Sequence, residues 1–239
     1  MYNLKFDSAH RTFEQYEREH PADPLGPVSD AAAYLYSEFD RLRILQSELF
    51  TNDNRFLTFS RPRADPDVVR RFEGALDSSK QKANQILASS PQDADALFAT
   101  TLRLGLHADY LALIEHRNLA SLSEIKEGRA VAEKLLAMHP EYYDAHIAVG
   151  VENYLLSLKS APLRWLLRAS GAQTDKQTGI EQLRLTAEKG RYLLPYARLL
   201  LAVVALRDRD IEQAKKTLSW LAGQFPGNRL YREELAKLH

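Results

Sequence analysis

Residues 128–140, GRAVAEKLLAMHP, decide the fold because their pattern returns along the chain. A small residue is followed by an apolar residue four positions on, a packing residue three positions later and a proline five positions after that. Residues 9–21, 79–91 and 214–226 repeat this order, and residues 179–191 repeat it without the proline. A small residue lets a neighbouring helix approach closely, and proline cannot continue a helix. The repetition therefore predicts an array of paired helices.

These copies resemble the second helices of tetratricopeptide repeats. Gly150 stands where that family prefers glycine in the first helix, whereas Thr101 and Ala202 take the equivalent places in other units. The tryptophan and tyrosine of the family consensus are mostly replaced. The resemblance implies an all-α, right-handed solenoid of about five stacked antiparallel helix pairs, forming one domain over residues 1–239.

The distances between copies predict long helices in the early units. Pro140 follows Pro91 by 49 residues, whereas a standard repeat has about 34, so each helix of this unit is expected to gain about two turns. Pro91 follows Pro21 by 70 residues, which predicts two still longer helices near 29–50 and 65–88 around an irregular segment at 52–64. The first repeat, residues 1–21, looks truncated. Either the chain is trimmed from a longer one or it starts naturally with a capping half-repeat.

Three sequence motifs mark expected helix starts. Asp65 followed by Pro66 offers an N-cap and a proline in the first turn. Residues 121–124 (SLSE) and 174–177 (TDKQ) match the capping box, in which two side chains satisfy free backbone N–H groups at a helix start.

Residues 158–176 form an insertion within the fourth unit. Its sequence, from SLKSAPLRWLLRASG onward, predicts a two-turn helix at 162–169, since a serine and then a proline favour a helix start. Three leucines, including Leu167, share one face, and two arginines share another. The helix could pack over the solenoid, contact a partner or touch a membrane surface. The contact residues would be Leu163, Arg164, Trp165, Leu166 and Arg168.

A second, local resemblance covers residues 150–183. GVENYLLSL at 150–158, then Pro162, Gly171, Gly179 and Leu183, are similar in order to the eukaryotic tetratricopeptide-repeat-thirty-nine family. This resemblance implies that the insertion is part of the architecture. It supplies no catalytic residues.

The concave face of the stacked first helices is the predicted binding surface. By the family resemblance, its lining positions are Asp95, Phe98, Leu102, Asp144, Ile147, Val151, Tyr154, Tyr196, Leu199 and Val203. None is the lysine, arginine or asparagine with which some family members grip a peptide carboxylate, so that activity is not carried over. An open groove of this kind would take apolar peptide side chains. The alternative is that these residues are core, covered by the chain itself.

Composition and motifs argue against several function classes. The chain has 32 basic and 32 acidic residues, so no net field favours nucleic acid. It has no cysteine, which excludes disulfides and thiolate metal sites. The densest histidine cluster places His107 and His116 on opposite helix faces, and we predict no metal or cofactor. No apolar run approaches the roughly 20 residues of a membrane-spanning helix.

The sequence therefore predicts a non-enzymatic scaffold that binds another protein or peptide through the concave groove. One alternative is a small-ligand-binding or enzymatic protein that uses the groove around Asp144, Glu152 and Tyr154. A third is peripheral membrane association through the helix at 162–169. The lack of cysteine and the truncated first repeat favour an exported or periplasmic protein over a cytoplasmic one. The sequence does not indicate an oligomeric state.

Overall fold

The structure, a computed structural model, describes residues 1–46, 51, 63–159, 165, 167, 169 and 171–238. This part of the chain contains α-helices and no strand. The helices are α1 (Phe6–Glu19), α2 (Leu25–Arg41), α5 (Pro66–Ser89), α6 (Ala94–Leu113), α7 (Asn118–Met138), α8 (His146–Ser157), α10 (Lys176–Lys189), α11 (Leu194–Arg207), α12 (Ile211–Gln224) and α13 (Arg229–Ala236), with a 3-10 turn η1 (Tyr143–Ala145) before α8.

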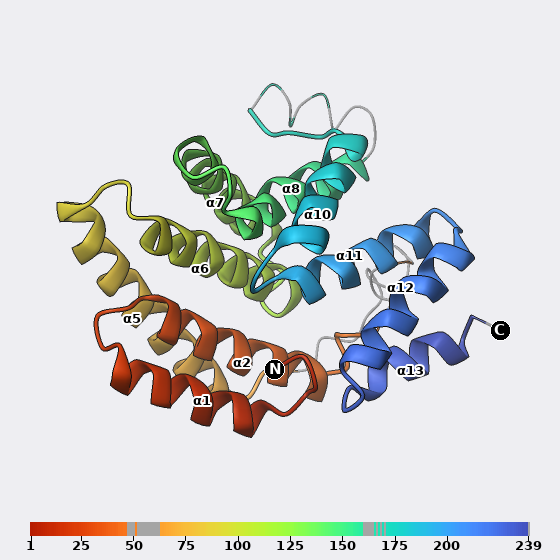
Figure 1. The fold of residues 1–239 in the computed structure, drawn as a ribbon, viewed down its shortest axis with the longest axis horizontal. Coiled ribbons are helices and arrows are strands. Elements are labelled where there is room, and N and C mark those ends of the chain that lie inside the picture. Colours follow the sequence, from red (N-terminus) through yellow and green to blue (C-terminus); the bar gives the residue numbers. More distant parts are fainter. Residues whose placement is uncertain are drawn as a thin grey trace.

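Each of these helices packs against the next one in the sequence, and α2 also packs against α6. The array curves until its last helices, α12 and α13, lie beside the beginning of the chain (Figure 1). The guanidinium of Arg229 in α13 donates two hydrogen bonds to Asp40 in α2, with the shorter N–O distance at 2.7 Å. The two ends of the array therefore touch. None of the described helices is both long enough and apolar enough to cross a membrane.

The predicted helix ends are confirmed at the prolines. The helices α1, α5, α7 and α12 each stop within two residues of Pro21, Pro91, Pro140 or Pro226, and α10 stops before Gly190. The predicted lengthening is also confirmed, because α5, α6 and α7 have 24, 20 and 21 residues whereas α10, α11 and α12 have 14 each.

The helix predicted at 29–50 is wrong at both ends, since α2 runs from Leu25 to Arg41. Its start includes Pro27, which is tolerated in a first helical turn because the missing N–H has no intrahelical partner there. Its end is set by Arg43, whose φ of 58° is left-handed. That conformation is usually adopted by glycine, so it could not be predicted from an arginine at this position.

Small residues lie where the repeat pattern placed them, at buried helix contacts. These residues are Ala9, Ser79, Gly128, Gly179 and Ala214. One close backbone approach joins α8 to α10. A Cβ on Gly179 would lie 2.6 Å from the backbone nitrogen of Tyr154, and one on Gly150 would lie 2.9 Å from Cγ of Leu183. Only glycine fits at both positions, which is how this pair of helices packs so tightly.

Two helix starts differ from the capping-box predictions. The helix α7 begins at Asn118, so Ser121 is buried inside it and caps nothing. At α10 the N-cap is Asp175, whose carboxylate accepts a hydrogen bond from the Thr178 N–H at 2.7 Å, and not Thr174. The predicted cap at Asp65 is confirmed, because its carboxylate accepts from the Asp67 N–H at 2.8 Å.

Candidate functional site

The residues predicted to line a groove lie on α6, η1, α8 and α11, and most are covered. Phe98 is fully buried, and Asp144, Ile147 and Tyr154 are nearly so. Five others are partly buried: Leu102, Val151, Tyr196, Leu199 and Val203. Asp95 is exposed and accepts a hydrogen bond from the Tyr142 hydroxyl at 2.8 Å. Most of the side chains predicted to line the groove are therefore packed against other residues, as core side chains are.

Aromatic rings from separate helices and turns meet across this inner face. Tyr36 of α2 packs edge-on against Tyr196 of α11, with ring centroids 6.0 Å apart. Phe98 of α6 contacts Tyr142 at 5.0 Å and Tyr192 at 5.9 Å. Such ring pairs stabilise by about 0.5–1.5 kcal/mol beyond the area they bury. They connect early, middle and late helices of the array across the concave side.

One carboxylate on this inner face has no compensating partner. Asp109 of α6 is partly buried, and no described residue forms a hydrogen bond or ion pair with it. Burial raises its pKa from the ordinary 3.8 to about 7. Burial first, and then the nearby Asp109 carboxylate, also raise the pKa of Tyr196. The neighbouring His107 faces away and pairs with Glu124 at 3.0 Å. Among the described residues, no group of three potential ligands could hold a metal ion.

Asp144 has a structural position that the sequence did not reveal. Its two carboxylate oxygens accept hydrogen bonds from three consecutive backbone N–H groups, those of Arg191 at 2.8 Å, Tyr192 at 3.0 Å and Leu193 at 2.7 Å. These groups form the turn that leads into α11. A Cβ on the preceding Gly190 would lie 2.9 Å from one of the same oxygens. The carboxylate therefore fixes the α10–α11 turn, and its lone pairs are engaged.

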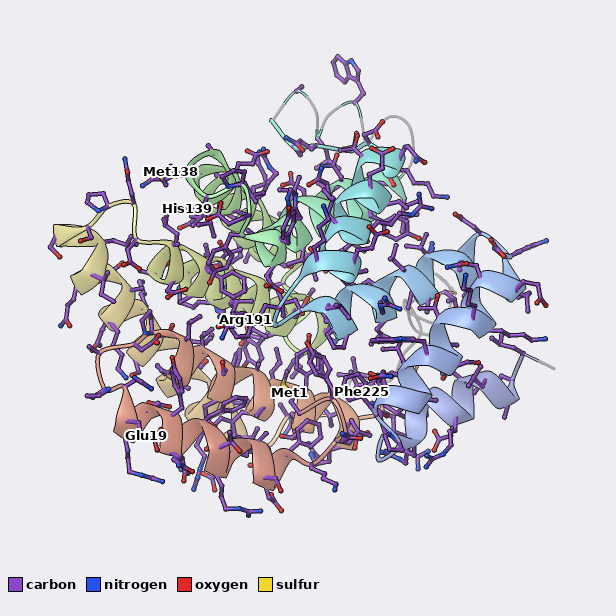
Figure 2. The ribbon with its side chains drawn as sticks, viewed as in Figure 1. Met1, Glu19, Met138, His139, Arg191 and Phe225 are labelled. Carbon is purple, nitrogen blue, oxygen red and sulfur yellow. The ribbon has the colours of Figure 1, made fainter. Side chains whose placement is uncertain are left out.

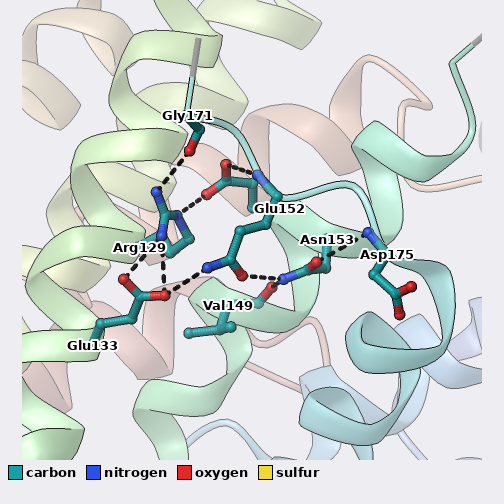
Figure 3. A network of polar contacts seen from close by, with 8 residues as sticks. Arg129, Glu133, Val149, Glu152, Asn153, Gly171 and Asp175 are labelled. Atoms are coloured by element: carbon teal, nitrogen blue, oxygen red, sulfur yellow. Dashed lines mark hydrogen bonds and ion pairs between the residues drawn. The ribbon is translucent and has the colours of Figure 1, made fainter. Parts of the chain in front are cut away.

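Glu152 is fully buried and forms an ion pair between two helices (Figure 3). The Nε of Arg129 in α7 lies 2.6 Å from its Oε2. The same guanidinium donates to Glu133 at 2.9 Å and to the backbone carbonyl of Gly171 at 3.2 Å. Burial raises the pKa of Glu152, and this effect is opposed by the Gln173 N–H and then by Arg129. The pair holds the chain where it returns from the insertion.

The network continues along the returning segment through amide groups. The Gln173 N–H donates to Glu152 at 3.1 Å, and the Gln173 side chain donates to Glu133 at 2.9 Å (Figure 3). Asn153 donates to the Gln173 side-chain oxygen at 2.7 Å and accepts from the Asp175 N–H at 3.1 Å. Buried polar groups that hydrogen-bond one another in this way rigidify their surroundings. It anchors the segment that leads into α10.

Tyr154, the third residue of the alternative site, is nearly buried, and burial raises its pKa to about 12. Two surface hollows lie elsewhere. One of about 460 Å³ is bordered by Tyr110 and Ile114, and one of about 250 Å³ is bordered by Asp40 and Arg229. Neither is lined by Asp144, Glu152 or Tyr154.

Part of the predicted insertion contact can be placed. Trp165 is 73% exposed. Leu167 is buried against Leu156 and Ala172, with Leu122 of α7 packed on the same cluster. The remaining predicted contact residues lie outside the described residues: Leu163, Arg164, Leu166 and Arg168.

Large apolar side chains stay exposed around that small cluster. We call them the insertion-end patch: Leu119 at 85%, Leu155 at 43%, Leu158 at 36% and Trp165 at 73%. Leu119 precedes Leu122 by one helical turn in α7, Leu155 precedes Leu156 in α8, and Leu158 follows the last residue of α8. Sequence reasoning found only Trp165. The other three are leucines near the start of α7 and the end of α8. They could not be singled out because leucine is also common in protein cores.

Comparison with known proteins does not assign the chain to a family. No family model, no curated protein and no solved structure matches the chain.

Proposed function

We propose that the chain is a right-handed α-solenoid of tetratricopeptide-like units that acts as a non-enzymatic scaffold and binds another protein through the insertion-end patch. The observation that carries the proposal is the exposure of large apolar side chains on the segments that meet at the Leu167 cluster. Six large hydrophobic residues are exposed among the described residues, and four of them lie on α7, at the end of α8 or in the insertion, the segments that contribute to this cluster. A group of this kind marks a contact surface far better than single exposed leucines do. The repeat pattern supports the solenoid, because repeat arrays typically present extended surfaces to partners.

The positions of the acidic residues also favour binding over catalysis. A catalytic carboxylate needs access to a substrate. Asp144 accepts three backbone N–H groups in a buried turn, and Glu152 is buried against Arg129. Both carboxylates have structural partners, and neither lines the hollows of the surface.

The test compares matched variants of the full chain. We expect quantitative proximity labelling with the full chain to recover a defined set of proteins. Leu119→Glu combined with Trp165→Glu should lower the recovery of these proteins by about tenfold, since a charge opposes burial of the patch. Ile211→Glu is the control, because Ile211 is also an exposed apolar residue, at 38%, but begins α12. Equal recovery with all three proteins, or no retained protein at all, contradicts the proposal.

The exposure of Trp165 favours a second candidate, which is shallow binding to a membrane surface. Tryptophan is enriched where one side of a residue is apolar and the other meets water. Flotation with anionic lipid vesicles tests it, and Trp165→Glu should abolish co-flotation. If the unmodified chain stays at the bottom of the gradient, this candidate is rejected while the protein-binding proposal stands.

A further inference from the structure

The first four residues lie in the middle of the molecule, between the two ends of the helical array. Residues 1–4 are all partly buried. Figure 2 shows Met1 between the early helices and Phe225, which follows α12. Met1 packs against the apolar cluster that includes Val28 and Ala31 of α2. This short segment therefore touches helices from both halves of the chain.

Tyr2 is held at three points by late residues. Its ring packs against Phe225, with centroids 5.3 Å apart. Its hydroxyl donates a hydrogen bond to the Tyr192 carbonyl at 2.9 Å, and its own carbonyl accepts one from the Asn228 side chain at 3.0 Å. Ring, hydroxyl and backbone are all recognised.

Asn3 and the α12–α13 turn fit each other closely. The Asn3 side-chain oxygen accepts a hydrogen bond from the Gly227 N–H at 2.9 Å. A Cβ on Gly227 would lie 3.0 Å from that oxygen and 3.3 Å from the Asn3 backbone oxygen. Glycine thus leaves the space that the segment occupies.

The backbone of the segment is held in an unfavourable conformation. Leu4 has a φ of 56°, which is uncommon for a residue with a side chain. Its N–H closes a turn by donating to the Met1 carbonyl at 2.8 Å. A strained residue persists when surrounding contacts define it. The strain and the contacts together describe a segment that is seated in a site.

We infer that Phe225, Gly227, Asn228 and the Tyr192 carbonyl, with the apolar cluster of α2, form a peptide-binding site that reads an apolar–Tyr–Asn segment, occupied here by residues 1–4 of the same chain. The partner is a protein with an accessible segment of that chemistry. The tyrosine hydroxyl and the asparagine carbonyl each meet a single complementary group, so phenylalanine or lysine at these places would leave a group unpaired. This site is distinct from the insertion-end patch and goes beyond the function proposed above.

Occupancy by the chain itself regulates access. A tethered segment competes at an effective concentration of about millimolar. A free peptide should therefore bind weakly to the unmodified chain and much more tightly when residues 2 and 3 no longer hold the site.

The test uses the full chain and a fluorescein-labelled peptide with the sequence MYNLKF, followed by fluorescence anisotropy. We expect the Tyr2→Ala/Asn3→Ala variant to bind the peptide at least about tenfold more tightly than the unmodified chain does. Adding Gly227→Val to that variant should abolish binding, because the side chain would occupy the place of Asn3. A peptide with the sequence MAALKF, which lacks the tyrosine and the asparagine, should not bind. Circular dichroism establishes that each variant is folded.

Two results would overturn the inference. One is a folded Tyr2→Ala/Asn3→Ala variant that does not bind the peptide at millimolar concentration. The other is equal binding by MYNLKF and MAALKF, which would show non-specific apolar contact. Neither result affects the patch, because recovery of partners there is measured with variants of Leu119 and Trp165. Conversely, loss of the patch proposal leaves peptide binding at Gly227 unchanged.

Discussion

Replacing Asp144 with asparagine tests how strongly one carboxylate holds the α10–α11 turn. The change preserves size but removes the charge and turns one of two acceptor oxygens into an NH₂ group. One of the three N–H groups of Arg191, Tyr192 and Leu193 then faces a donor. The other two keep only a neutral acceptor. Charged hydrogen bonds contribute about 1.5–3 kcal/mol and neutral ones about 1, so we expect the free energy of unfolding to fall by about 3 kcal/mol.

The assay is urea unfolding followed by circular dichroism. The midpoint should fall while the slope stays unchanged, because the surface exposed on unfolding is the same. Asp77→Asn is the matched control, since Asp77 is exposed on α5, and it should change stability by less than about 0.5 kcal/mol. If Asp144→Asn costs less than about 1 kcal/mol, the carboxylate does not fix the turn and the reasoning is refuted.

Three further changes probe other buried groups. Burial raises the pKa of Asp109 in the folded chain to about 7 from the ordinary 3.8. The free energy of unfolding is therefore unaffected by this group below pH 3.8 and falls as the pH rises from there through 7. Asp109→Asn should raise the free energy of unfolding by about 4 kcal/mol at pH 8, since a pKa difference of one unit corresponds to about 1.4 kcal/mol, and should raise the Tm at pH 8 but not at pH 4. An equal Tm difference at both values would contradict this. Gly179→Ala should cost about 2–3 kcal/mol in urea unfolding because it crowds the α8 backbone, whereas Gly74→Ala, with open space around it, should be neutral or stabilising. Arg129→Met leaves the Glu152 carboxylate buried without its partner and should lower the free energy of unfolding by about 3 kcal/mol. Adding Glu152→Leu to that variant should recover most of this loss. If the losses from the two substitutions simply add, the result argues against the ion pair.

The sequence predicted those parts of the fold that depend on local backbone chemistry. Proline ends a helix wherever it stands, so the ends of α1, α5, α7 and α12 could be read directly. Small residues such as Gly179 mark close helix contacts, and the structure has them buried. The end of α2 could not be read, because Arg43 adopts a left-handed conformation without being glycine.

The roles of polar residues depended on distant partners and could not be read from the sequence. Asp144 occupied a lining position in the expected groove, but its partners lie 47 to 49 residues further on. Asn3 and Gly227 are 224 residues apart. Helical periodicity shows which face a residue is on and says nothing about which backbone groups meet that face.

Residues 1–4 close the helical array, because they contact α2 at one end and the α12–α13 turn at the other. Hydrogen–deuterium exchange, resolved on peptides that cover residues 1–6 and 225–229, tests it most directly. The account predicts that both segments exchange slowly in the unmodified chain, because the Gly227 N–H donates to Asn3, and that Asn3→Ala accelerates exchange in both. Exchange of both segments at the rate of free peptides in the unmodified chain would contradict closure.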